Sequence, residues 1–205
     1  MALTPEQKRA IAWVDYAAGL ASVETGPLSF AIGAAASMAY YYDKKASEGW
    51  GIVFYPPQPI PSTSNDLGIL HNLTCEQLVA NGFTQSNYDN IIQSASEVRP
   101  DLSTELNAIT ISYFNEKVNS VQLIDLITPE SELEFTLNII PLNVYDQNIF
   151  LQTLNILQNA NETEWVNNLN DLILQISSFT LSETEKTGLI NSLQILKHSF
   201  VLWGS

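Results

Sequence analysis

The feature that most constrains the fold is a stretch over residues 25–42 that contains no charged side chain. Ala31, Ala35 and Ala39 recur at four-residue intervals, so a helix here carries a smooth ridge of small side chains. Such ridges let neighbouring helices approach closely. A helix without a polar face must bury most of its surface. The segment is therefore expected in a protein core, in a membrane or in a self-association contact.

Of these three interpretations, a buried core helix or helical hairpin is favoured. The stretch of about 18 residues is at the short limit for crossing a bilayer. Its apolar character comes mainly from alanine, and Asp15 and Glu24 precede it closely. Charges in a membrane helix are costly, so these two carboxylates count against insertion. Membrane association through residues 25–42 is retained as an alternative.

Most of the remaining sequence is typical of helices. Thr4, Pro5 and Gln7 form a capping box with proline at the first helical position, and Ser182 with Glu185 forms another. Apolar residues recur with helical spacing between these signals. We therefore predict an all-α fold, with helices over residues 4–22, 27–45, 66–81, 86–98, 128–140, 146–157, 163–176 and 182–201, among others. Thr163 is expected to cap the helix over 163–176.

Four prolines within six residues mark the best internal boundary. They exclude a helix and favour an extended connector, and a short β-prone run over residues 52–55 precedes them. The predicted organisation is an N-terminal helical hairpin over 1–48, a Pro-rich connector over 49–64 and a multi-helix bundle over 65–205.

The charge balance excludes one class of partner. Eight Lys and Arg residues stand against 22 Asp and Glu residues, which gives a net charge of −14. Phosphate binding needs clustered basic residues, so we expect no nucleic-acid partner. Asp15 and Glu24 also interrupt the apolar run that follows Lys8 and Arg9, so no intact signal peptide is expected.

The densest chemical candidate surrounds His71 and Cys75. The two residues are four apart, so they share one face of a continuous helix, where Asp66 or Asn72 could orient the imidazole. Such a pair could form a cysteine nucleophile or a metal site, but core packing is the favoured interpretation. One cysteine and two histidines exclude multi-cysteine and three-histidine metal sites. We assign no catalytic, cofactor-binding or metal residue, and keep as candidates His71, Asn72, Cys75, Asp66 and His198.

His198, in the last predicted helix, is better explained as a cation near a helix C-terminus than as a ligand. A site shared by His198, His71 and Cys75 would require the two predicted helices to meet.

Three short segments together resemble a group of uncharacterised Bacteroidota proteins. They are the small-residue stretch over 26–40, the segment Gly68-Ile69-Leu70-His71-Asn72, and the aromatic ending Lys197-His198-Ser199-Phe200-Val201-Leu202-Trp203. The group pairs a Gly/Ala-rich N-terminal stretch with a Gly-x-x-His-Asn segment and an aromatic tail. This chain has fewer glycines in the first stretch. The resemblance implies no activity, but it draws attention to His71, Asn72 and His198.

The sequence as a whole favours a non-enzymatic helical interaction protein with a protein partner and no cofactor, envelope-associated or secreted in a bacterium rather than cytoplasmic. Two alternatives stay open. One is a membrane-active, toxin-like protein that inserts its N-terminal hairpin. The other is a small enzyme or metal-binding protein centred on His71 and Cys75.

Overall fold

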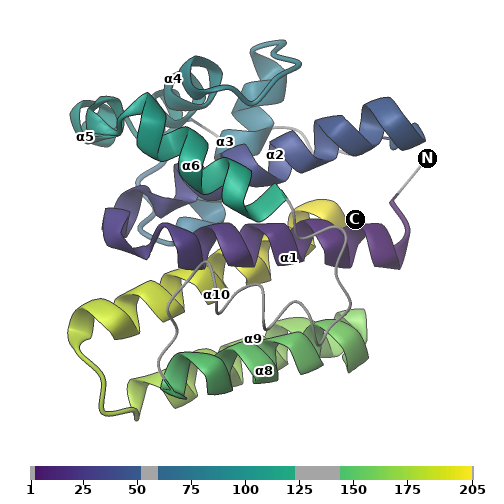
Figure 1. Cartoon of the computed structure of the whole chain (residues 1–205), viewed down its shortest axis with the longest axis vertical. Helices are drawn as coiled ribbons and strands as arrows, with labels where there is room; N and C mark the ends of the chain where they lie inside the picture. Colours follow the sequence, from purple (N-terminus) through teal and green to yellow (C-terminus); the bar gives the residue numbers. More distant parts are fainter. Residues whose placement is uncertain (1–2, 52–59, 123–143, 205) are drawn as a thin grey trace.

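The computed structural model describes residues 3–51, 60–122 and 144–204. Every regular element in these ranges is a helix, which confirms the all-α prediction (Figure 1). The elements are α1 (Pro5–Ala21), η1 (Val23–Leu28), α2 (Ser29–Glu48), α3 (Leu67–Ala80), α4 (Tyr88–Val98), η2 (Pro100–Leu102), α5 (Ser103–Ala108), α6 (Ile111–Gln122), α8 (Val144–Asn159), α9 (Glu162–Ser177) and α10 (Glu183–Gly204). The helix predicted over 128–140 and the β-prone run over 52–55 lie outside the described residues.

Local capping chemistry fixes the starts of α1 and α10 at the residues that the sequence predicts. The Thr4 hydroxyl accepts from the Gln7 amide and the Gln7 side chain accepts in return, so α1 begins with the predicted capping box. Ser182 and Glu185 do the same for α10. The predicted cap of α9 is wrong by two residues. Asn161 caps it instead, through a side-chain oxygen that accepts from two backbone amides, because asparagine is among the best N-cap residues.

The turn between the first two helices also differs from its prediction. A helix was expected to start at Pro27, but η1 occupies Val23–Leu28 and α2 begins only at Ser29. Gly26 has φ of 57° within this turn, a left-handed conformation that only glycine adopts without strain. This kink reverses the chain, so that α2 returns along α1 as the second arm of a hairpin (Figure 1).

The hairpin forms part of the core. All residues from 29 to 38 are buried, and α2 contacts α1, α3, α4, α6 and α10. Helix α10 packs against α1, α3 and α9, while α8 and α9 form an outer layer beside α1 and α10 (Figure 1). A single cluster of buried side chains runs through these helices. In the described part of the chain, no helix is long and apolar enough to cross a membrane.

Candidate functional site

Four helices meet at a buried polar junction in this apolar core. Asp15 comes from α1, Ser37 from α2, His71 with Cys75 from α3, and Ser199 from α10, and all five side chains are fully buried. We call this group the Asp15–His71 junction. The small residues of α2 make room for it, because a Cβ atom on Gly33 would lie 3.3 Å from the His71 ring.

The contacts of the junction centre on Asp15. His71 Nε2 lies 3.2 Å from Asp15 Oδ1, within the distance of an ion pair. The two groups are not aligned as a hydrogen bond requires. The Ser199 hydroxyl donates to the other carboxylate oxygen. Ser37 Oγ is 3.3 Å from His71 Nε2 and 3.8 Å from Cys75 Sγ. Each carboxylate oxygen therefore faces a group that can supply a proton.

The neighbours of the imidazole identify one nitrogen that carries a hydrogen. Asn72 Nδ2 donates to the backbone oxygen of His198 at 2.8 Å, so Asn72 Oδ1 is the atom that faces His71 Nδ1 at 2.9 Å. An amide oxygen only accepts, and hence Nδ1 carries a hydrogen. Burial alone lowers the pKa of His71, but the Asp15 carboxylate outweighs it and raises this pKa above its ordinary value. The Asp15 carboxylate therefore favours the protonated form of the buried imidazole.

The second histidine forms a separate pair near the surface. His198 Nε2 lies 3.2 Å from Asp66 Oδ2, and Asp66 Oδ1 caps α3 by accepting from the amides of Gly68 and Ile69. Burial raises the pKa of Asp66, but His198 and these amides outweigh it and hold the pKa below its ordinary value. The side chain of Asn72 links the two histidines, through the His71 ring and the His198 backbone oxygen.

The five candidate residues from the sequence thus belong to one connected network across α3 and α10. Sequence reasoning missed three members of the junction, Asp15, Ser37 and Ser199. The available signal was Asp15, a single acidic residue inside an apolar run. A charge at such a position needs a buried partner, and a histidine is the natural one.

The junction is chemically closed. Burial raises the pKa of the Cys75 thiol well above its ordinary value, and the negative charge of Asp15 adds to the rise, so the thiol stays protonated. Neither Cys75 nor His71 has any exposed surface. Among the described residues, no group of three or more His, Cys, Asp or Glu side chains is arranged to hold a metal ion. In this conformation the junction joins helices, and its side chains have no exposed surface.

We expect Cys75 to be unreactive until the fold opens. Alkylation of the native chain at pH 8 should be at least about 100-fold slower than in guanidinium chloride, because the reagent must wait for a costly local opening. Mass spectrometry measures this rate without background, since the chain has a single cysteine. Equal rates in the two states would contradict the sealed position.

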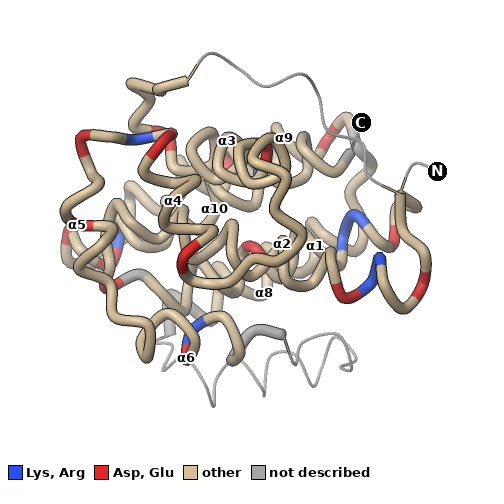
Figure 2. Tube along the Cα trace, turned by 90° about the horizontal axis from the view of Figure 1, so that it is seen from above, with Lys and Arg blue, Asp and Glu red and all other residues tan. Residues whose placement is uncertain are grey.

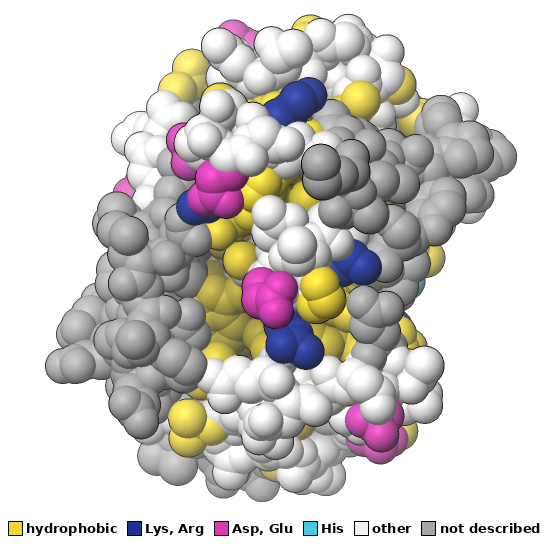
Figure 3. Space-filling view, turned by 90° about the vertical axis from the view of Figure 1, so that its right-hand side faces the viewer, with side chains coloured by type: hydrophobic (Ala, Val, Ile, Leu, Met, Phe, Trp, Pro, Cys, Tyr) yellow, Lys and Arg dark blue, Asp and Glu magenta, His cyan; other side chains and the backbone are white. Residues whose placement is uncertain are grey.

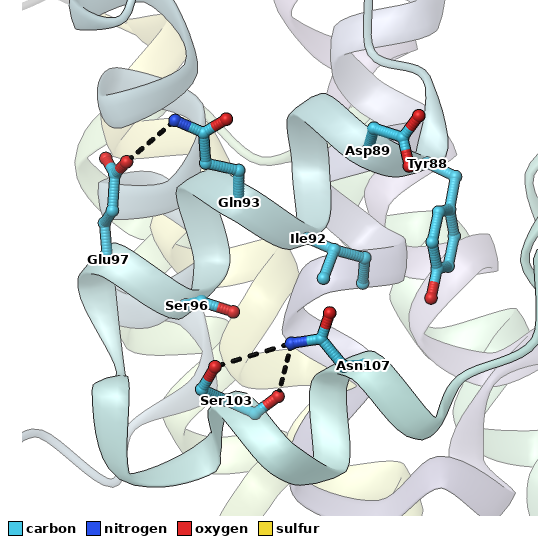
Figure 4. Close-up of a pocket in the computed structure, with 8 residues that line it drawn as sticks. All are labelled: Tyr88, Asp89, Ile92, Gln93, Ser96, Glu97, Ser103 and Asn107. Carbon is cyan, nitrogen blue, oxygen red and sulfur yellow. Dashed lines mark hydrogen bonds between the residues drawn. The ribbon is translucent and has the colours of Figure 1, made fainter.

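An open pocket between α4 and α5 is the second candidate (Figure 4). It has a volume of about 350 Å³ and is lined mainly by polar side chains: Tyr88, Asp89, Ile92, Gln93, Ser96, Glu97, Ser103 and Asn107. The Asn107 amide donates to the hydroxyl and carbonyl oxygens of Ser103 on the lower wall. The Ser96 oxygen is buried, has no hydrogen-bond partner within the described residues and points into the pocket.

A fixed negative charge stands at the rim of this pocket. Glu97 accepts from three side-chain amides, Gln77 at 2.6 Å, Asn81 at 3.0 Å and Gln93 at 3.0 Å. Burial raises the pKa of Glu97, but these donors outweigh it and lower the pKa below its ordinary value. Asp89 adds a second, exposed carboxylate. None of the eight lining residues is basic.

Comparison of the chain with protein-family models, with curated proteins and with solved structures finds no match. The resemblance to Bacteroidota proteins therefore stays a prediction.

Proposed function

We propose that the protein is a non-enzymatic helical interaction protein that binds a partner in the pocket between α4 and α5. One contrast carries this proposal. His71 and Cys75, which could take part in chemistry, are fully buried in the core, whereas the polar pocket opens to solvent. A group that is reached by solvent can also be reached by a partner's side chain.

The chemistry of the pocket favours a partner that presents a cationic side chain. Glu97 and Asp89 supply carboxylate oxygens (Figure 4). Lysine and arginine make charge-assisted hydrogen bonds to such oxygens. The net charge of −14 attracts a cationic partner from a distance as well. Basic residues are sparse along the described chain (Figure 2), and on the face shown in Figure 3 they are mixed with acidic ones.

The two alternatives from the sequence, a membrane-active protein and an enzyme or metal-binding protein, stay predictions. The buried positions of residues 29–38 and of His71 and Cys75 favour neither of them.

A charge-matched comparison tests the proposed pocket. We expect Glu97→Gln to weaken the binding of a labelled nine-residue arginine peptide about tenfold, because a charge-assisted contact of roughly 1.4 kcal/mol is lost. Glu183→Gln, which removes an equal charge from an exposed position on α10, should change the affinity less than about twofold. Fluorescence anisotropy at 150 mM salt measures both.

Equal weakening by the two variants would mean that the peptide responds only to net charge, and the proposed pocket would then be wrong. Asp89→Asn gives a second reading from the opposite side of the pocket, where a smaller loss is expected because this carboxylate is exposed.

A further inference from the structure

We infer that the Asp15–His71 junction is a pH-sensitive clamp that holds α1 against α3 and α10 and loosens as the pH rises. This inference concerns the core of the bundle and does not depend on the proposed pocket. It starts from the position of Asp15, a fully buried carboxylate in the middle of α1 whose partners come from two other helices.

Among the groups that face His71, one carries a charge that can pair with the imidazole. Helix α1 contributes the carboxylate of Asp15, α2 contributes the uncharged Ser37, and α3 contributes the amide of Asn72. The Cys75 thiol lies one hydroxyl away and stays protonated. Other titratable groups lie near this part of α3. Glu76 contributes to the raised pKa of Cys75, and Cys75 contributes to the raised pKa of Tyr42. The Asp66–His198 pair lies beyond Asn72.

Asn72 determines which proton His71 loses. Its oxygen keeps the hydrogen on Nδ1, so deprotonation must take place at Nε2, the atom that faces Asp15. The neutral ring then turns a lone pair toward the carboxylate. Asp15 retains the Ser199 hydroxyl but no positive partner, and its charge is left uncompensated in the core. Water reaches this oxygen only when α1 separates from α3 and α10.

The direction of the pH effect follows from the His71 proton. Its pKa in the folded state is raised above the ordinary value of 6.5. Below pH 6.5 the open and closed states both hold the proton, so the full stabilisation is present. Between pH 6.5 and the folded-state pKa only the closed state holds it, and the stabilisation is lost as the pH rises. One proton changes the opening equilibrium by at most about tenfold per pH unit.

Native-state hydrogen exchange of the full chain tests the clamp. After correction for intrinsic exchange rates, we expect the opening constant of α1 to rise between pH 6.5 and 8.5, by up to about tenfold per pH unit. In Asp15→Asn this dependence should disappear. Helix α9, which contributes no residue to the junction, serves as the internal reference. A flat profile for α1, the same slope in Asp15→Asn, or equal slopes in α1 and α9 would each overturn the inference.

His198→Gln is the matched control, since it removes the other histidine and its pair with Asp66. The α1 slope should persist in this variant, and its loss would assign the pH dependence to the surface pair instead. The same variant leaves His71 as the single histidine, so its NMR titration is unambiguous even where Asp15→Asn fails to fold. A folded-state pKa at or below 6.5 would overturn the clamp.

Discussion

Replacing His71 with glutamine is expected to cost about 4 kcal/mol of unfolding free energy at pH 7. The variant keeps a side-chain amide but removes the imidazole that pairs with the buried carboxylate of Asp15. Breaking a buried ion pair by removing one partner costs about 3–5 kcal/mol, because the remaining charge is left uncompensated in the core.

The reverse substitution has a much smaller expected effect. In Asp15→Asn the imidazolium is left without its partner, but at pH 7 His71 can release its proton almost without cost because its ordinary pKa is 6.5. We expect a loss of less than about 2 kcal/mol, mostly from imperfect hydrogen bonding. The two halves of one ion pair should therefore differ clearly in their cost.

Chemical denaturation followed by circular dichroism measures both variants. The double variant Asp15→Asn/His71→Gln should be more stable at pH 7 than His71→Gln alone, because no buried charge remains. Equal costs for the two single variants would contradict an ion pair.

The helix starts illustrate what local sequence can predict. The caps at Thr4 and Ser182 depend on residues only three positions apart, so the sequence contains all of their chemistry. The prediction for the cap of α9 was wrong because two good N-cap residues, Asn161 and Thr163, lie close together. The prediction of a helix start at Pro27 was wrong because proline permits both a helix start and a tight turn.

In the candidate site, too, local features were predicted and long-range contacts were not. The shared face of His71 and Cys75 followed from helical spacing within α3, and in the structure both side chains approach the Ser37 hydroxyl. Their partner Asp15 is 56 positions away from His71 along the chain, and Ser199 is 184 positions away from Asp15. No periodic signal connects residues at such separations, because their contact depends on how whole helices pack.

Small residues explain why the helices can pack this closely around a polar centre. Gly33 leaves space for the His71 ring, and Gly19 on α1 faces the backbone of Ser192 on α10, where an added Cβ would lie 3.1 Å from the Ser192 Cα. The small side chains that made residues 25–42 resemble a membrane segment thus have a packing role in this fold. It brings backbones together so that short polar side chains can meet.

The tightest of these approaches predicts the second large effect, at Gly68. Substituting alanine there should destabilise the fold by at least about 2 kcal/mol, because a Cβ would lie nearer than 3.0 Å to both the backbone oxygen of Gln194 and the His198 ring. The carbonyl belongs to the α10 backbone, so the clash is relieved only when α3 and α10 separate. That separation also lengthens the contact between His198 and Asp66.

Helix propensity alone predicts the opposite sign. In a helix interior, alanine is favoured over glycine by about 1 kcal/mol, so a position with free space would be stabilised by the change. Ile69→Ala alters the neighbouring, partly exposed position of the same turn and should cost no more than about 1 kcal/mol. Thermal and guanidinium unfolding compare the two variants. Stabilisation by Gly68→Ala would show that α3 and α10 do not approach as closely as described, and the distances from Asn72 and Asp66 to α10 would then have to be revised.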